Sequence, residues 1–471
     1  MTARRDTRRD ALHDPLADPV RFIDERTSSA PLLRKSMRYL FPDHWSFLLG
    51  EVAIYCFLVL IVTGTYLALF YDPSTAKTVY HGSYAPLQGQ QMSGAYYSVL
   101  NLSLQIPAGL LMRQVHHWAA DVFLAVIVVH LMRVFFTGAF RKPRELTWLI
   151  GVALLGISLL EGYLGYSLVD DLLSGVGLAI GYGAGLSIPV IGGPVIQGIF
   201  GGSFPGTTEF FSRMYIVHVF LIPGLLTALI VGHVGLVAAK HHTQFKESAR
   251  TTDKRLVGAP LFPAQVPRSL GLMFLVAGVL FLLGGLVQVN PIWQWGPFEP
   301  WLSENGAQPD WYLGWLIGAL RLMPSFDVTI GKYTLIPNPF WGGIAFPTLV
   351  FGVLMAFPWL ERRFTKDHRV HNLANRPREA PNRTAFGVML LSWVFLIFLF
   401  GAADRILVLW GLSYQLQLYL FRVGIWLVPA VLFVVTRRWC LALQAADRIE
   451  ERREAAEERA RHRPAGRAME P

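Results

Sequence analysis

Eight long apolar stretches constrain the fold of this 471-residue chain more than any other feature. Each has about 20 residues, which as a helix rising 1.5 Å per residue crosses the roughly 30 Å hydrocarbon core of a bilayer. A hydrophobic content of 53% and a mean hydropathy of +0.40 agree with this. The sequence therefore predicts an all-α integral membrane protein with eight transmembrane helices, near residues 46–70, 112–136, 146–168, 214–239, 269–289, 340–360, 384–402 and 415–436.

Lysine and arginine residues gather in alternate loops, which is the usual sign of orientation in a membrane. Nine of them lie between Arg4 and Arg38, whereas the next loop has only Lys77 and the loop at about 167–212 has none. Both termini are therefore expected in the cytoplasm, and the formal net charge of +10 does not require a nucleic-acid partner. About 45 mainly polar residues precede the first stretch, so no cleavable signal peptide is expected.

A polar stretch at 240–255 separates the first four apolar stretches from the last four. The outward loops at about 167–212 and 290–339 are long and rich in Gly, Pro and Trp, as expected of short-helical cover over a site. The mixed charges after residue 445 favour a solvated helix over a nucleic-acid site. The predicted division is a cytoplasmic N-terminal segment 1–45, a first transmembrane domain 46–255, a second transmembrane domain 256–436 and a charged cytoplasmic tail 437–471.

Three histidines lie in the second apolar stretch, where an ionisable side chain is costly and usually serves a site. At 100° per residue, the 14 steps from His116 to His130 fall about 40° short of four whole turns, so these two share a helix face. The 13 steps from His117 to His130 leave His117 about 140° away. His117 is therefore not expected on the face that His116 and His130 share.

The fourth stretch carries His218 and His233, and their 15 steps overshoot four turns by about 60°. Pro223 between them can kink the helix and absorb part of this difference. Since both helices run from outside to inside, the four histidines form two pairs at matched depths. Each pair can ligate a haem iron from both sides, as in electron-transfer haems. The first four helices are thus predicted to form a di-haem bundle, with packed or proton-relaying histidines as the weaker alternative.

Charged and small residues accompany the histidines at matching positions. Arg113 and Arg133 lie three residues from His116 and His130 on the same face, where they could bind haem propionates or, alternatively, snorkel to the surface. Glycines repeat with the same 14-residue step and could admit a flat macrocycle, or only close helix packing; they are Gly50, Gly64, Gly151 and Gly165. The two cysteines, Cys56 and Cys440, provide no iron–sulfur or covalent haem motif, so such centres would belong to partner chains.

Four segments resemble the cytochrome b family of bc complexes over about residues 35–436. They read RQVHHWAADVFLAVIVVHLMRVFFTGAF, ELTWLIGVALLGISLLEGYLGYSL, IPVIGGP and PDWY. The 15-residue step on the fourth helix resembles the chloroplast and Gram-positive branch. The unsplit chain, its N-terminal segment and its basic tail are similar to actinobacterial members, which oxidise menaquinol.

The resemblance implies two non-covalent b-type haems: an outer one of lower potential on His116 and His218, and an inner one of higher potential on His130 and His233. It also implies an outer quinol site at Pro309, Asp310, Trp311 and Tyr312, where the family has Pro-Glu-Trp-Tyr. Asp310 would accept a quinol proton and Tyr312 would line the pocket, although an interfacial aromatic belt also accounts for Trp311 and Tyr312. Asp310 is one methylene shorter than the family's Glu. Gly177 and Ile188 align with short helices that cover this site.

The inner quinone site is poorly marked in the sequence. Lys240 and His241 are its candidates, together with His242, Arg268 and Ser269, but exposed cationic loop residues are the stronger account of each. Leu48 stands where the chloroplast branch has a cysteine, so an additional covalent haem is not expected.

The resemblance implies the function of a cytochrome b subunit of a quinol:cytochrome c reductase, expected in a bacterial cell membrane. The expected partners are a Rieske iron–sulfur subunit, a cytochrome c subunit and a second copy of the chain, with a terminal oxidase as a further supercomplex partner. Two other classes stay open from the residues alone: a haem-carrying membrane anchor of a dehydrogenase, and a proton-coupled transporter.

Overall fold

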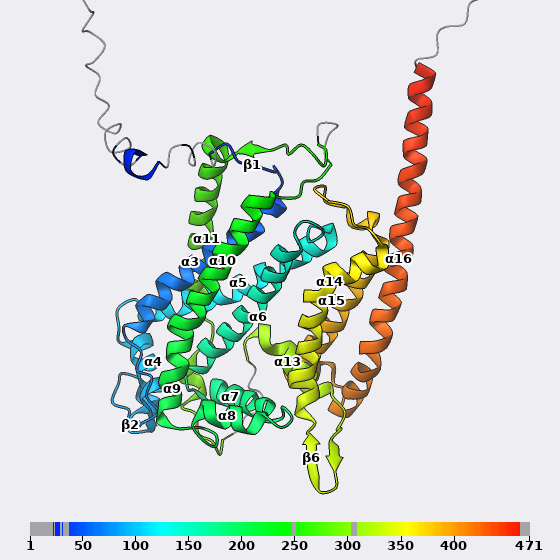
Figure 1. Cartoon of the computed structure of the whole chain (residues 1–471). Coiled ribbons are helices and arrows are strands. Elements are labelled where there is room, and N and C mark those ends of the chain that lie inside the picture. Colours follow the sequence, from blue (N-terminus) through cyan, green and yellow to red (C-terminus); the bar gives the residue numbers. More distant parts are fainter. Residues whose placement is uncertain are drawn as a thin grey trace, which may run out of the picture.

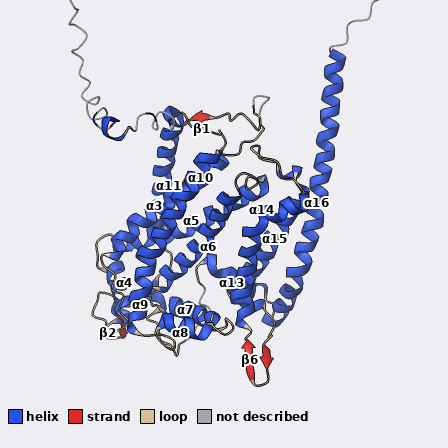
Figure 2. Ribbon diagram, viewed as in Figure 1, coloured by secondary structure: helices blue, strands red, loops and turns tan. Residues whose placement is uncertain are grey.

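The computed structural model of this chain describes residues 22, 24–28, 31, 37–246, 251–302 and 309–461. Most of the predicted segment 1–45 and the last ten residues of the predicted tail lie outside these ranges. The described part is almost entirely helical (Figure 2), and its strands form only short antiparallel pairs. The pairs are β1 (Leu40–Phe41) with β4 (Ala259–Pro260), β2 (Lys77–Val79) with β3 (Gln91–Ser93), and β5 (Val328–Ile330) with β6 (Tyr333–Ile336).

Eight helices of the described ranges are long and apolar enough to cross a membrane, as the sequence predicts. The eighth continues well beyond the others (Figure 1), because its 48 residues extend for about 72 Å. In chain order the eight are α3 (Leu49–Ala68), α5 (Gly109–Thr137), α6 (Glu145–Ser167), α9 with α10 (Thr208–Ile216 and Ile222–Lys240), α11 (Val266–Leu286), α14 (Phe346–Thr365), α15 (Pro381–Gly401) and α16 (Tyr414–Arg461).

Three of these helices contain a π-helical turn, and in each case a proline follows two residues after the turn ends. The turns are η3 (Val217–Leu221), η4 (Leu261–Gln265) and η6 (Trp341–Ala345). A proline has no backbone N–H to donate, so the regular i→i+4 hydrogen bonds are interrupted there. In each turn, the residue directly before the proline makes an i→i+5 bond instead. The turn η4 begins helix five at Leu261, and α9 begins helix four at Thr208, both earlier than the apolar pattern alone indicates.

The helices pack in two groups. In the first group, α3 packs against α5, and α6 packs against α10. In the second, α15 packs against α16 and the short helix α13 (Gly314–Leu322). The fifth spanning helix, α11, packs against α3 and α5, so it lies with the first group although the sequence division places it in the second transmembrane domain.

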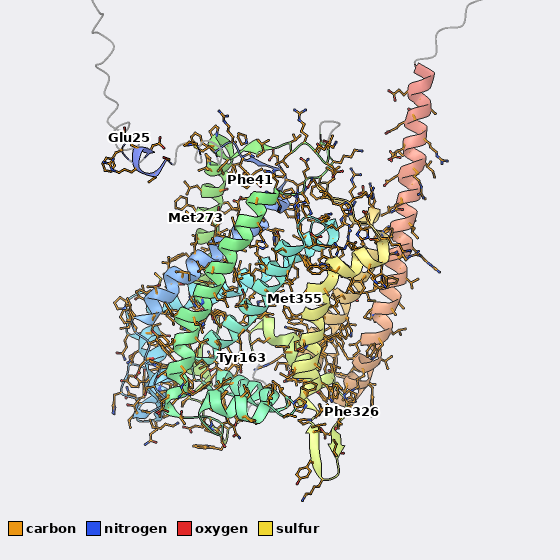
Figure 3. All side chains as sticks on the ribbon, in the orientation of Figure 1. Glu25, Phe41, Tyr163, Met273, Phe326 and Met355 are labelled. Atoms are coloured by element: carbon orange, nitrogen blue, oxygen red, sulfur yellow. The ribbon has the colours of Figure 1, made fainter. Side chains whose placement is uncertain are left out.

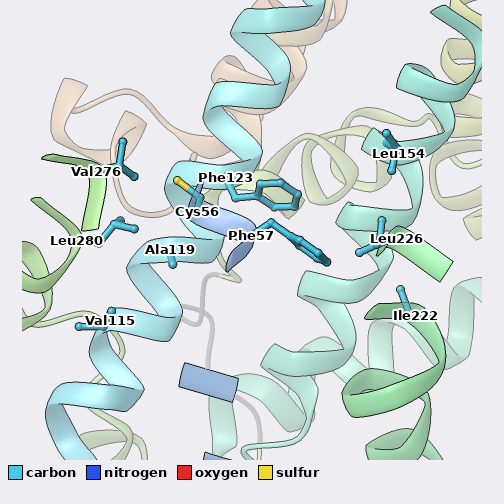
Figure 4. Packing of buried hydrophobic residues seen from close by; sticks show 10 residues of the cluster. All are labelled: Cys56, Phe57, Val115, Ala119, Phe123, Leu154, Ile222, Leu226, Val276 and Leu280. Atoms are coloured by element: carbon cyan, nitrogen blue, oxygen red, sulfur yellow. The ribbon is translucent and has the colours of Figure 1, made fainter. Parts of the chain in front are cut away.

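The largest buried cluster lies inside the first group (Figure 4). Phe57 of α3 and Phe123 of α5 meet there with their ring centroids 5.9 Å apart. Phe57 is seven residues, about two turns, from both Gly50 and Gly64. Phe123 is equally far from both His116 and His130. The cluster is therefore an apolar layer between the two histidine levels; it comprises Cys56, Phe57, Val115, Ala119, Phe123, Leu154, Ile222, Leu226, Val276 and Leu280.

The two ends of the helices differ in their cover (Figures 1 and 3). We call the end with α7 (Leu172–Leu186), α8 (Gly192–Phe200) and the β5–β6 hairpin the outer end, following the orientation predicted from the charges. Phe326 marks this end, and Phe41 marks the opposite, inner end. The other short elements are α4 (Gly94–Leu104), α12 (Ile292–Trp295) and the 3-10 turns η1 (Trp45–Phe47), η2 (Ala85–Leu87), η5 (Trp311–Leu313), η7 (Pro377–Glu379) and η8 (Leu407–Trp410).

Candidate functional site

At the outer level, the rings of His116 and His218 face each other across the bundle. Their centroids are 6.4 Å apart and their planes are nearly perpendicular, at 82°. Nδ1 of His116 lies 2.9 Å from Oγ1 of Thr63, whose hydroxyl donates to the carbonyl of Val59. Thr63 can therefore only accept from His116, so Nδ1 carries the hydrogen and Nε2 keeps a free lone pair. A metal ligand needs this form of the ring.

His218 reaches this level from the π turn η3. Its Nδ1 lies 2.9 Å from Oε1 of Glu161 on α6, a carboxylate that the sequence reasoning did not select. Because a π turn holds one residue more than an α turn, it absorbs the extra residue of the 15-residue step to His233. The register between these two histidines thus depends on the π turn, which the proline after it favours, rather than on a kink alone.

At the inner level, His130 and His233 are close enough to interact electrostatically. Nδ1 of each is buried and has no hydrogen-bond partner among the described residues. The cation of Arg133 stacks 4.1 Å above the ring of Phe47, and its Nε donates to Ser46. The inner level is therefore an apolar and aromatic site with unused nitrogen atoms.

Each histidine of the two pairs packs against one of the four predicted glycines. A Cβ at Gly165 would lie 2.5 Å from Cε1 of His218, and one at Gly64 would lie 3.1 Å from Cε1 of His116. At the inner level, the corresponding distances are 3.3 Å from Gly151 to His233 and 3.6 Å from Gly50 to His130. The glycines therefore make room directly for the imidazole rings. The sequence suggested that they make room for the haem macrocycle.

Of the two predicted arginines, Arg113 is buried and Arg133 is partly buried, and both have unused donors. Arg113 donates through Nη1 to the carbonyl of Asn290, while its Nε and Nη2 have no hydrogen-bond partner among the described residues. Nη2 of Arg133 is likewise buried and unpartnered within the described part of the chain. Buried guanidinium groups with free N–H donors call for an anionic partner.

One cavity of about 290 Å³ at the outer end brings the outer histidines together with the PDWY segment. Asp310 and Tyr312 line it with Arg113, His116 and His218. The hydroxyl of Tyr312 donates to Oδ2 of Asp310 over 2.9 Å, and the Tyr312 ring occupies space that a Cβ at Gly162 would fill. The predicted proton acceptor and the predicted outer haem ligands therefore share one cavity.

His117 also lines this cavity, although the sequence reasoning assigned it no role. Its Nε2 lies 2.9 Å from Oδ1 of Asp310, and 3.9 Å from Oδ2 of Asp121 one turn further along α5. In the sequence, only its position within a membrane span marks His117 as a candidate. Its partner Asp310 lies 193 residues away in the chain, so no local pattern links the two. Helical periodicity correctly separates His117 from His116 but does not show which group it meets.

Four other predicted residues of the outer site are not among the described residues that line this cavity. Gly177 of α7 packs against Tyr166, which lines the cavity, but neither Gly177 nor Ile188 is among the described residues that line it. Pro309 and Trp311 flank Asp310, and Trp311 is 41% exposed. Trp311 faces a second, almost wholly apolar cavity of about 370 Å³ between α5, α6, α14 and α15, which Tyr312 also lines.

At the inner end, the side chains of Lys240 and His241 are exposed. Their carbonyl groups accept hydrogen bonds from the guanidinium of Arg144. The backbone of His241 has a positive φ of 59°, and the next residue, His242, turns inward to meet Tyr39 and Phe47. Burial, and then the nearby Arg133, lower the pKa of His242 to about 4, so this ring is neutral at physiological pH.

Comparisons with known proteins identify the family. A family model described as "Cytochrome b(N-terminal)/b6/petB" matches residues 121–297. The "Cytochrome bc1 complex cytochrome b subunit" of Streptomyces coelicolor is 45% identical over 431 residues, covering 91% of this chain and 78% of that protein. This chain belongs to the cytochrome b subunits of the bc1 complex. The subunit of Corynebacterium diphtheriae is 43% identical over 437 residues, covering 93% and 80% of the two chains.

A solved structure agrees with this cytochrome b fold. A chain of "Hyperthermophilic respiratory Complex III" superposes with a TM-score of 0.65, covering 89% of this chain and 96% of that chain at 22% identity. The predictions of an all-helical membrane protein and of a cytochrome b subunit are thus confirmed. The chain is a multi-pass membrane subunit of a cytochrome bc1 complex, and its family carries b haems.

The residues at both levels of this cytochrome b fit such haems. His116 offers a free Nε2, the rings of His116 and His218 leave space for an iron between them, and the four glycines keep side chains away at both levels. The unpartnered donors of Arg113 and Arg133 match the carboxylates that a haem carries as propionates.

Proposed function

We propose that this cytochrome b subunit oxidises a quinol in the outer cavity and reduces a quinone near the inner end. One electron leaves to a Rieske partner, and the other crosses the membrane by way of two b haems, held by His116 with His218 and by His130 with His233. When bound, the haems supply two one-electron carriers. Proton release outside and uptake inside would then build a membrane potential.

The shared outer cavity is the observation that supports this proposal most. It is lined by a carboxylate, a tyrosine hydroxyl and the two outer histidines. A quinol there could give a proton to Asp310 while its electron has only a short path to the outer level. The adjoining apolar cavity beyond Tyr312 suits a substrate with a long isoprenoid tail, and menaquinol is the proposed quinol.

Asp310 has the properties of a proton acceptor. Burial alone would raise its pKa, but the His117 imidazole beside it, and hydrogen bonds from His117 and Tyr312, hold the pKa below its usual range. The carboxylate is therefore ionised and able to accept before the quinol binds. Burial and the Asp310 charge raise the pKa of Tyr312 well above its usual value, so this phenol keeps its proton and orients the carboxylate.

The inner end supports a second quinone site around Phe47, His242 and Arg133. The pairing of a neutral, inward-facing imidazole with aromatic rings suits a quinone head group better than the exposed Lys240 and His241. We keep Lys240 and His241 only as neighbours of this site.

Membership in a bc1 complex supports further proposals about the assembly. These are a Rieske subunit, a cytochrome c subunit, a homodimer, a supercomplex with a terminal oxidase, and both termini in the cytoplasm of a bacterium. The division into transmembrane domains 46–255 and 256–436 is also a proposal, since α11 packs with the first group.

The substitution Asp310→Asn tests the outer site because it keeps the side-chain size and removes the base. Loss of a positioned base typically costs about 100- to 10,000-fold in rate. We expect menaquinol-analogue oxidation to fall in this range while both haem spectra persist. Asp310→Glu should keep substantial activity, because it restores the residue of the wider family.

The matched control is Asp327→Asn, an exposed carboxylate at the outer end outside the cavity. It should turn over like the wild type. Wild-type turnover of Asp310→Asn across the pH range would contradict the outer-site proposal.

A further inference from the structure

We propose that His117 is a positioning residue that holds the carboxylate of Asp310 in the orientation needed to receive a quinol proton. This inference rests on the proposed role of Asp310 at the outer site. His117 follows His116 directly on α5, about 100° further round the helix. One turn of α5 would therefore hold the outer haem with one side chain and the proton acceptor with the next.

The hydrogen-bond directions around Asp310 support this role. An ionised carboxylate only accepts, so Nε2 of His117 donates to Oδ1 over 2.9 Å. The hydroxyl of Tyr312 donates to Oδ2 over the same distance. Two donors from different elements thus fix the plane of the carboxylate. Each oxygen keeps a second lone pair that a substrate hydroxyl can reach.

Backbone geometry alone does not fix this side chain. Asp310 precedes the three-residue turn η5, and its own side chain makes no capping bond to that turn. The side chains of both partners are largely buried, with 15% of His117 and 14% of Asp310 exposed.

Several other titratable groups face Asp310. Asp121 lies on α5, Tyr166 on α6, Asp171 directly before α7, and Tyr312 in η5 itself. The carboxylates repel the charge of Asp310, whereas His117 donates to it directly and lies 3.9 Å from Asp121. Without His117, the ionised form of Asp310 would be less favoured, and its carboxylate would be held by Tyr312 alone.

Two variants of similar size separate positioning from packing. His117→Gln keeps an N–H donor, whereas His117→Met does not. A misplacement of about 1 Å can cost about 100-fold in rate, so we expect His117→Met to lose about 10- to 100-fold in kcat with a smaller change in the quinol KM. His117→Gln should recover most of kcat. Both variants should show two bis-histidine b-haem spectra in the assembled complex.

The pH profile gives a readout that loss of packing would not move. Removing the donor raises the pKa of Asp310, so the acid limb of kcat/KM should shift to higher pH in His117→Met and less in His117→Gln. His81→Ala, which removes an exposed histidine of an outer loop, is the matched control and should leave the profile unchanged.

The outcomes distinguish this inference from the function on which it rests. Wild-type kcat and pH profile in His117→Met, equal losses in the Gln and Met variants, or loss of the outer haem in both, would each overturn the positioning role. If Asp310→Asn is inactive while His117→Met is normal, only the positioning role falls. If Asp310→Asn is fully active, the outer-site proposal itself falls.

Discussion

At the scale of single residues, four histidine–glycine contacts position the predicted haem ligands. In each contact, a glycine of α3 or α6 leaves space for an imidazole from α5 or the fourth spanning helix. The tolerance for one added methyl group differs, because the space for a Cβ is smallest at Gly165 and largest at Gly50. This gradient makes the contacts testable one by one.

We expect Gly165→Ala to reduce the content of the outer haem or shift its potential, because its Cβ would overlap His218 at 2.5 Å. Overpacking of this kind costs about 1–3 kcal/mol. Gly50→Ala should be nearly neutral, since its Cβ would make an ordinary contact at 3.6 Å and alanine favours helix by about 1 kcal/mol over glycine. Redox titration of the haem bands in purified variants measures both effects.

Gly271→Ala provides the control for this pair, since no atom of the described residues outside its own stretch of helix lies within 4 Å of a Cβ placed there. Equal haem content and potentials in Gly165→Ala, Gly50→Ala and Gly271→Ala would show that the glycines serve only ordinary helix packing.

At the scale of elements, the π turn η3 determines whether His218 and His233 share a face. Fifteen residues in a regular α-helix overshoot four turns by about 60°, and one wider turn removes this excess. Since His218 lies within η3 itself, residues removed after it but inside the turn should restore a regular helix without rotating His233.

Deleting Phe220, which is 75% exposed, should therefore keep both haems. Deleting Val231, which is 66% exposed and lies beyond the π turn, should rotate His233 by about 100° and abolish the inner haem. Haem quantification in membranes distinguishes the two deletions. Loss of the inner haem from both would mean that η3 does not set the register.

The elements also show which features can be predicted from sequence. The spanning helices, the shared face of His116 and His130, and the glycine steps depend on local periodicity, which the sequence displays directly. The bond between His117 and Asp310 joins positions 193 residues apart, and no local pattern specifies it. The inner end is hard to predict for a related reason: a positive φ at His241 reverses the chain, so His242 and not His241 turns inward.

At the scale of the whole molecule, the two ends of the helices carry different features. The outer end carries the cavity and the β5–β6 hairpin, while the inner end carries the long charged extension of α16 (Figure 1). An outer site for quinol oxidation would release protons to the outside only if this orientation is the real one. The direction of proton release in the proposed function therefore depends on the topology.

Cysteine labelling can test the topology, because both native cysteines are buried, Cys56 at 0% and Cys440 at 7% exposure. We expect a membrane-impermeant thiol reagent to label Lys332→Cys, in the β5–β6 hairpin, on intact cells. Arg452→Cys, on the exposed extension of α16, should be labelled only after the cells are opened. The unsubstituted chain gives the background of each experiment. The opposite pattern, with Arg452→Cys but not Lys332→Cys labelled on intact cells, would show that the orientation is the reverse of the proposed one. The Asp310 cavity would then face the cytoplasm, and protons released there could not build the proposed potential.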